Sequence, residues 1–196
     1  MKNYYRLKPF STIEDMRIKE IIWEKETLKS HNRGLEINIA DSPEIFFEKV
    51  KLNHRDFFIG PYTLPIISDK LKKILEKLEN DLPFMQFIPV KSNIKIDYYV
   101  LNLLENIYCF DWDESEYTRY PEFLTELQDR PDEISKLVLV KEKIGKRNIF
   151  RMEEQSVHIF ISDKLSDILV ENDITGIKIT KTPNLRQMYD DGALSS

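Results

Sequence analysis

The chain has 196 residues, of which 41% are hydrophobic and 32% charged, and its formal net charge is −5. This balance is typical of an ordinary globular protein and excludes a disordered one. A single cysteine excludes an intramolecular disulfide, the polar start resembles no signal peptide, and no apolar run approaches the ~20 residues of a membrane span. We therefore expect one cytoplasmic domain over residues 1–196, with no membrane partner.

The first elements follow from short hydrophobic patterns. Residues 4–7 are apolar and aromatic and stop before Pro9, which predicts a short strand. The spacing of Ile18 and Ile21, with charged residues between, then predicts a helix over residues 13–28.

The pattern weakens over residues 29–55, where turn residues cluster. Within this stretch Phe46 and Phe47 favour a short helix over residues 43–52. Strand character resumes at residues 56–59.

The chain then contains a segment that it repeats. The sequence ISDKL at residues 67–71 recurs at residues 161–165, and the apolar spacing after it also recurs. Ser68 and Ser162 stand where a hydroxyl can cap a helix, and Gly176 stands where the second copy must turn into its last strand. Each copy has an apolar run before the helix and an extended run after it.

These repeats predict the fold class. We expect an α+β fold with a mixed β-sheet and helices packed on it, built around two similar strand-helix-strand units at about residues 56–90 and 149–180. A crossover of this kind usually makes its two strands parallel and right-handed.

Residues 97–104 form the longest apolar extended stretch and predict a central strand, irregular near Glu105 and Asn106. Cys109 is expected to be a small buried hydrophobic residue. The central strand is expected to continue over residues 107–110. Further strands are expected at residues 137–140 and 149–152, around a turn at Gly145, and an exposed tail at residues 183–196.

Charge is concentrated after the central strand. Residues 105–133 contain ten acidic and two basic residues, a net charge of −8 against −5 for the whole chain. Three interpretations stay open for this segment: a solvated turn, a site for a divalent cation, or a protein-binding face. The candidate partner-binding residues are Asp111, Trp112, Asp113, Glu114, Glu116 and Tyr117.

Patterns for other chemistry are missing from the sequence. His31, His54 and His158 are far apart and form no metal-binding pair, and no phosphate-binding glycine loop or nucleophile motif occurs. The acidic segment lacks the glycine of a calcium-binding EF-hand loop. We therefore expect no catalytic residues, no metal and no cofactor. Nucleic acid is an unfavourable partner because the acidic field repels phosphate.

Five ordered segments resemble the bacterial immunity protein 11 family: MKNYYRLKPF, FIGPYTLPIISDKLKKIL, DYYVLNLLENIYCFDWDESEY, KLVLVKEKIGKRNIFRM and VHIFISDKLSDILVENDITGIKI. The family pattern has a YYxLN strand that leads to an acidic D-x-x-x-S-E, an I-x-G-x-x-I-F-[KR] hairpin and a closing S-x-x-[LF] helix with x-G-[LIV]. The matching residues are Tyr98, Tyr99, Leu101, Asn102, Ser115, Glu116, Ile144, Ile149, Phe150, Arg151, Ser162, Leu165, Gly176 and Ile177.

The resemblance implies a cytoplasmic immunity protein that binds and neutralises a cognate toxin without catalysis. A basic nuclease domain is one candidate for that toxin. Trp112 and Tyr117 would anchor the contact, and the four carboxylates around them would steer it. The competing class is a divalent-metal-dependent enzyme or ligand-binding domain that uses the acidic cluster at residues 111–116, and a third is a structural protein with no toxin partner.

Overall fold

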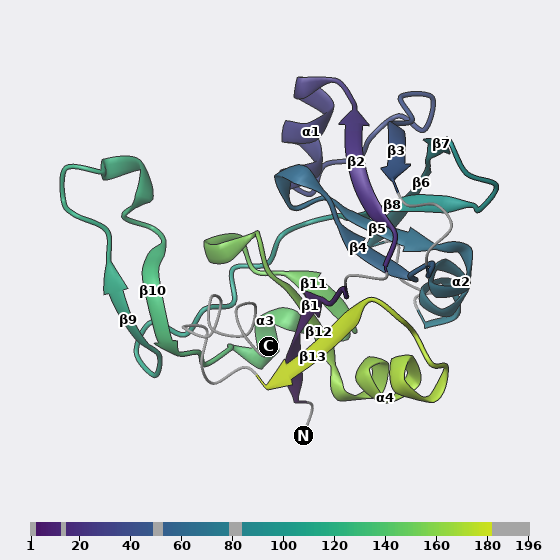
Figure 1. The fold of residues 1–196 in the computed structure, drawn as a ribbon. Coiled ribbons are helices and arrows are strands. Elements are labelled where there is room, and N and C mark those ends of the chain that lie inside the picture. The colour runs from purple at the N-terminus through teal and green to yellow at the C-terminus, as the bar shows by residue number, and fades with distance from the viewer. Residues whose placement is uncertain (1–2, 13–14, 49–52, 79–83, 182–196) are drawn as a thin grey trace.

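The computed structural model describes residues 3–12, 15–48, 53–78 and 84–181 (Figure 1). The fold is α+β, as the sequence predicts. Its strands are β1 (Tyr4–Pro9), β2 (Arg17–Ile22), β3 (Glu44–Glu48), β4 (Phe57–Ile59), β5 (Pro65–Ser68), β6 (Met85–Pro89), β7 (Lys91–Ser92), β8 (Tyr98–Leu103), β9 (Glu116–Arg119), β10 (Pro131–Lys136), β11 (Ile149–Arg151), β12 (Ile159–Ser162) and β13 (Ile177–Lys181). Its α-helices are α1 (Lys25–Asn32), α2 (Asp69–Leu78), α3 (Lys141–Ile144) and α4 (Asp163–Glu171).

Two four-stranded sheets share one topology. Their strand orders are β4-β5-β8-β6 and β11-β12-β1-β13, and every pairing within them is antiparallel. In the first sheet α2 follows β5 and precedes β6, and in the second α4 follows β12 and precedes β13. The two strands of each predicted unit are therefore parallel to each other, but a third strand lies between them. The mixed pairing occurs elsewhere, in the sheet β2-β3-β7.

The helix caps of the two units are equivalent, as the repeated sequence predicts. The Oγ of Ser68 accepts a hydrogen bond from the backbone N–H three residues on at 3.2 Å and donates one to Asp56 at 2.7 Å. The Oγ of Ser162 does the same, at 3.3 Å from the backbone and 2.9 Å to Asn148. Each serine thus joins its helix to the residue that immediately precedes the first strand of its own sheet.

The central strands are also equivalent, which the sequence analysis missed. Ser68 pairs with Tyr98 in the first sheet, and Ser162 pairs with Tyr4 in the second. This register aligns DYYVL at residues 97–101 with NYYRL at residues 3–7. The repeated unit therefore has four strands, and in the second copy its central strand comes from the beginning of the chain.

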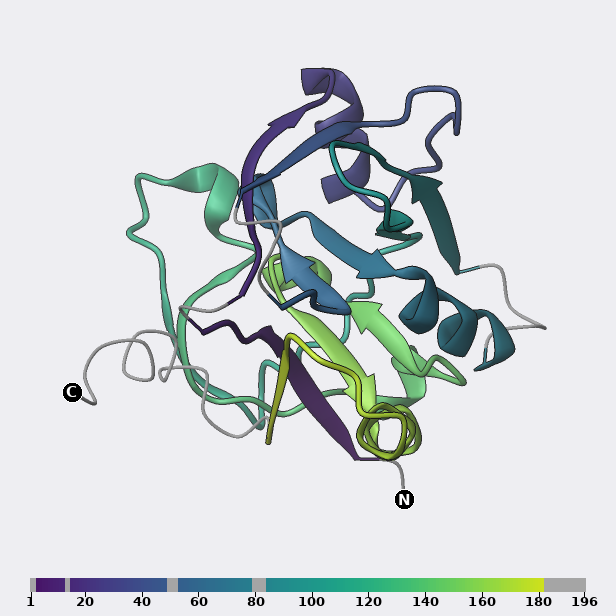
Figure 2. The same cartoon turned by 45° about the vertical axis from the view of Figure 1, so that its right-hand side comes forward.

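One hydrophobic core joins the two sheets. It contains residues of both central strands and of both helices, and α2 and α4 lie beside each other in both views (Figures 1 and 2). Each helix contributes two residues at helical spacing, Leu71 and Leu75 from α2 and Leu165 and Leu169 from α4, all at most 3% exposed. Burial of four such side chains stabilises the junction by roughly 6–12 kcal/mol before entropy is counted.

The outer faces of the two sheets are covered differently. Residues such as Ile66 and Val100 of the first sheet pack under the β2-β3-β7 sheet, against Ile45 and Phe47. The outer face of the second sheet packs against residues 107–144 and Met152, in which the only described sheet is the two-stranded pair of β9 and β10. Its cluster consists of Tyr4, Ile107, Cys109, Phe110, Ile134, Leu137, Ile144, Phe150, Met152 and Phe160.

Residues 13–14 of the helix predicted over residues 13–28 lie outside the described residues, and the first described part of that prediction is wrong. Residues 17–22 form β2, and α1 begins only at Lys25. The pairing of β2 with β3 shifts register between Ile18 and Glu20, which marks a β-bulge. A bulge adds one residue to the strand, so Ile18 and Ile21 both reach the core. Their three-residue spacing therefore imitates a helix.

Other expected elements differ too. In the predicted helix over residues 43–52, residues 44–48 form β3 instead, in which Ile45 and Phe47 alternate as buried residues, and residues 49–52 lie outside the described residues. Residues 107–110 and 137–140 form isolated bridges instead of strands, and α3 precedes the turn at Gly145. The chain breaks near Glu105 as expected, with a φ of 62° there, but β8 ends at Leu103 instead of continuing through a bulge.

The remaining predicted strands and both predicted helices after the serines are present. Cys109 is fully buried, as expected, and burial raises the pKa of its thiol to about 12. The predicted tail at residues 183–196 lies outside the described residues. No helix in the described part of the chain has the length and hydrophobicity to cross a membrane.

Candidate partner-binding surface

A β-ribbon projects from the side of the molecule opposite α4 (Figures 1 and 2). We call residues 116–136 the arm: β9 and β10 pair antiparallel, and the short 3₁₀-helix η2 (Thr125–Leu127) lies in the connection between them. Gln155 holds the start of β10 to the body, because its side-chain N–H donates to the Pro131 carbonyl at 2.9 Å. The arm and the turn before it carry most of the acidic segment.

The turn before the arm contains four of the six candidate residues, Asp111 to Glu114, while Glu116 and Tyr117 lie in β9, and Asp111 builds the turn. One carboxylate oxygen of Asp111 accepts the backbone N–H groups of Asp113 at 3.1 Å and Glu114 at 3.0 Å. The backbone N–H of Ser115 donates to the Asp111 carbonyl at 3.1 Å. Asp111 is therefore a structural residue of the turn, while the side chains of Asp113, Glu114 and Glu116 are exposed.

The two aromatic candidates form one cluster with Phe110. Ring centroids of Phe110, Trp112 and Tyr117 lie 4.7–5.3 Å apart in edge-to-face arrangements. The guanidinium of Arg119 lies over both outer rings, 5.1 Å from that of Trp112 and 5.4 Å from that of Tyr117. Such ring and cation contacts are worth about 1 kcal/mol each. Trp112 and Tyr117 are thus fixed and only partly exposed. The sequence did not predict that Arg119 covers both rings.

Side chains for metal binding do not come together. Within residues 3–12, 15–48, 53–78 and 84–181, no three His, Cys, Asp or Glu side chains are grouped so that they could hold a metal ion. This includes the whole acidic turn at residues 111–116.

The three histidines lie in separate places. His54 is exposed, whereas His31 and His158 are buried. Burial, with the charge of Arg151, lowers the pKa of His31 to about 4. Burial, with the charges of Arg6 and Lys8, lowers that of His158 to about 3. Both buried rings are therefore neutral at neutral pH.

His31 belongs to a polar contact between the two sheets. Its Nε2 lies 3.3 Å from the Leu101 carbonyl in β8 and 3.3 Å from a guanidinium nitrogen of Arg151 in β11. Arg151 also donates to the His31 carbonyl at 3.1 Å. Arg151 is only 1% exposed, and burial lowers its pKa to about 10. The contact is sealed from solvent and joins the two halves of the fold.

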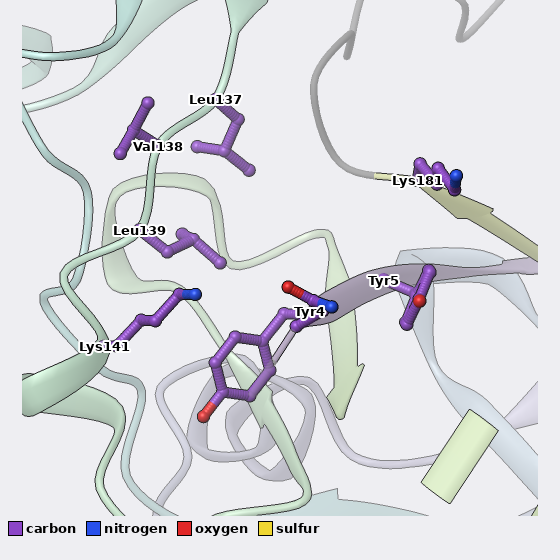
Figure 3. A pocket seen from close by; sticks show the side chains of 8 residues that line it. Tyr4, Tyr5, Leu137, Val138, Leu139, Lys141 and Lys181 are labelled. Atoms are coloured by element: carbon purple, nitrogen blue, oxygen red, sulfur yellow. The ribbon is translucent and has the colours of Figure 1, made fainter. Parts of the chain in front are cut away.

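A pocket of about 420 Å³ lies between the base of the arm and the first strand (Figure 3). Its walls are the start of β1, the extended residues 137–139 and two cationic side chains, Lys141 and Lys181. The lysines and leucines suit an acidic or amphipathic group of a partner.

Comparison with known proteins gives one family. The family model described as Immunity protein family (Imm11) matches residues 8–183, which includes both four-stranded sheets except the first residues of β1, and the whole arm. No curated protein matches the chain.

Proposed function

Because the chain belongs to the Immunity protein family (Imm11), we propose that it binds a cognate toxin in the cytoplasm and neutralises it without catalysing a reaction. The partner would be a protein with a basic surface, such as a nuclease domain. Neither nucleic acid nor a membrane is the expected target, since residues 105–133, which include most of the arm, carry a net charge of −8.

The observation that carries this proposal is the exposed acidic turn at the base of the arm. Asp113 and Glu114 present two carboxylates on a backbone that Asp111 holds in place, and Glu116 adds a third exposed carboxylate at the start of β9. A fixed cluster of one sign attracts a basic partner and aligns it before contact. The surrounding segment, residues 105–133, has a net charge of −8, which extends this field.

We assign the parts of Trp112 and Tyr117 that remain exposed to the same contact. Aromatic side chains inside a charged rim supply much of the binding energy in protein interfaces. Because Phe110 and Arg119 already fix both rings, little side-chain entropy would be lost when a partner covers them.

The first test is genetic and biochemical. If the gene beside that of this chain encodes a toxin, that toxin should kill cells that lack this chain, and the purified pair should form a complex. Survival of the unprotected cells, or no complex at micromolar concentration, would contradict the proposal.

The second test addresses the acidic turn. Replacing Asp113→Lys and Glu114→Lys together should slow association with that toxin about 5- to 10-fold at low ionic strength, and less at high salt, because steering is screened. The backbone N–H groups that bind Asp111 remain, so the turn should persist. Association rates by surface plasmon resonance give the measurement.

The matched control is Asp167→Lys with Glu171→Lys on α4, which makes the same change in net charge at exposed positions on the opposite side of the molecule. Equal slowing by both double variants would mean that total charge, not this face, sets the rate. Unchanged association in the Asp113 and Glu114 variant would reject the face.

A further inference from the structure

The tip of the arm presents one aromatic ring to solvent. Phe123 is 79% exposed, more than any other large hydrophobic side chain in the described part of the chain. It lies in the connection between β9 and β10, at the end of the arm away from the acidic turn (Figure 1). A lone exposed hydrophobic residue is common on protein surfaces, so the support beneath Phe123 has to carry the argument.

That support begins with a tight turn. The backbone N–H of Leu124 donates to the Pro121 carbonyl at 2.9 Å, which places Phe123 in the third position of a β-turn. The side-chain amide of Gln128 lies within 3.0–3.3 Å of the carbonyl oxygens of Tyr120, Pro121 and Leu124. One side chain thus fixes both ends of the turn that carries Phe123.

Arg119 connects this turn to the aromatic cluster. Its guanidinium donates to the Gln128 carbonyl at 3.4 Å and to the Tyr117 hydroxyl at 3.1 Å while lying over the rings of Trp112 and Tyr117. Those rings pack on Phe110, which is 1% exposed in the core. A continuous set of contacts therefore runs from the core to the tip of the arm.

The charge around the tip has the sign of the acidic turn. Glu122 and Glu126 are exposed on either side of Phe123 in sequence. The basic residues of this region are already engaged: Arg119 holds the tip, and Arg130 lies 3.8 Å from Asp129 and 3.7 Å from Glu153. Phe123 is thus an apolar group with a negative border.

From this geometry we propose that Phe123 anchors the complex by inserting into an apolar pocket, bordered by Lys or Arg side chains, on the surface of the toxin. The inference rests on the proposed function and adds the residue and the chemistry of its receptor. Interface hot spots are typically aromatic, and a group already held in its bound position loses little entropy on binding. Trp112 and Tyr117 support the arm, and their ring faces are partly covered by Arg119 and Phe110.

The test uses the full chain and the toxin encoded beside its gene. Phe123→Ala should speed dissociation about 30-fold or more and abolish protection of cells at low expression, while Phe123→Tyr should restore slow dissociation. Dissociation rates by surface plasmon resonance give the readout. All variants should keep the wild-type melting temperature, because the ring of Phe123 contributes little to folding at 79% exposure.

Val170→Ala on α4 is the matched control, since Val170 is 66% exposed and lies far from the arm. It should dissociate like the wild type. If the wild type binds and Phe123→Ala dissociates equally slowly, the anchor is wrong and the proposed function stands. If the wild-type chain does not bind the toxin at all, both fall.

Discussion

The two four-stranded sheets of this protein have the same strand order and the same helix caps, yet their outer faces are covered by different structures. The first sheet is covered by another sheet, and the second by a long irregular segment from which the arm projects. Inner faces have to fit each other within one core, so packing constrains both at once. The structures that cover the two outer faces do not pack against each other in one core. The candidate partner-binding surface lies on the structure that covers the second sheet.

The contrast extends to single residues. Arg151 in β11 occupies the register position that Ile59 occupies in β4, because each is the third residue of the first strand in its hairpin. Ile59 packs against the shared core, whereas Arg151 donates to the His31 carbonyl of the other half. The equivalent positions therefore differ where the halves meet, and the comparison predicts that the junction is the most sensitive part of the fold.

The largest effect is expected at Gly176, in the loop after α4. A Cβ there would lie 2.3 Å from the Phe57 carbonyl oxygen of the first sheet, and its φ of +81° disfavours any side chain. Gly176→Ala should lower the free energy of unfolding by about 3–5 kcal/mol, measured by urea denaturation.

Gly145→Ala provides the matched control. Its φ is +65° and its ψ −129°, but a Cβ would meet nothing within 4 Å, so only the conformational cost of about 1–3 kcal/mol is expected. Equal losses in the two variants would show that the contact between loop and β4 does not matter.

Lowering the pH is expected to have a smaller effect on the free energy of unfolding. The pKa values of His31 and His158 are lowered in the folded protein. Below a pH of about 6.5, these two histidines therefore bind protons in the unfolded chain but stay neutral in the folded one. The stability that both residues contribute is present above that pH and is lost as pH falls toward 4. Between pH 7 and pH 5 each should account for a loss of about 2 kcal/mol.

Denaturation curves of His158→Gln at the two pH values check this, and its loss should be about 2 kcal/mol smaller than that of the wild type. The pKa of the buried Glu154 is raised, so that group acts in the opposite direction and is common to both proteins. His54→Gln, at an exposed position, should leave the pH dependence as it is. An unchanged slope in His158→Gln would contradict the assignment.

The smallest effect concerns the equivalence of the helix caps. Ser68→Ala and Ser162→Ala each remove one acceptor for a helix N–H and one donor to the neighbouring strand, so each should cost about 1–2 kcal/mol. Ser162 is 0% exposed and Ser68 is 8% exposed, so the loss at Ser162 should be at the upper end. A negligible loss of stability in either variant would show that the two helix caps are not energetically equivalent. Urea denaturation at neutral pH measures both.

Much of the repeated unit could be predicted because its signals are local. The apolar spacing after Ser68 and Ser162, and the serines themselves, identify two helices and their first turns. The equivalence of β1 and β8 is also written in the sequence, as NYYRL and DYYVL. The equivalence could not be predicted because Tyr4 pairs with Ser162, which is distant in sequence, and short patterns carry no information about such pairing.

The arm and part of the candidate site could not be predicted. In β9 every residue is exposed or partly exposed, so the sequence has no alternation of hydrophobic and polar residues that would predict a strand. The carboxylates of the turn are visible in sequence, but only geometry separates Asp111, which binds the backbone, from its exposed neighbours. The same holds for Arg119 and Gln128, whose importance depends on which carbonyl oxygens and rings they reach.

The position of β1 has a consequence for biosynthesis. Its partners β12 and β13 follow every other described strand in the chain, so β1 stays unpaired until they have been synthesised. The first sheet is continuous in sequence from β4 to β8 and can close much earlier. Nascent chains would therefore have a folded first sheet and an incomplete second sheet. A chain released from the ribosome before residue 159 would expose unpaired strand edges, which promote aggregation or binding by chaperones.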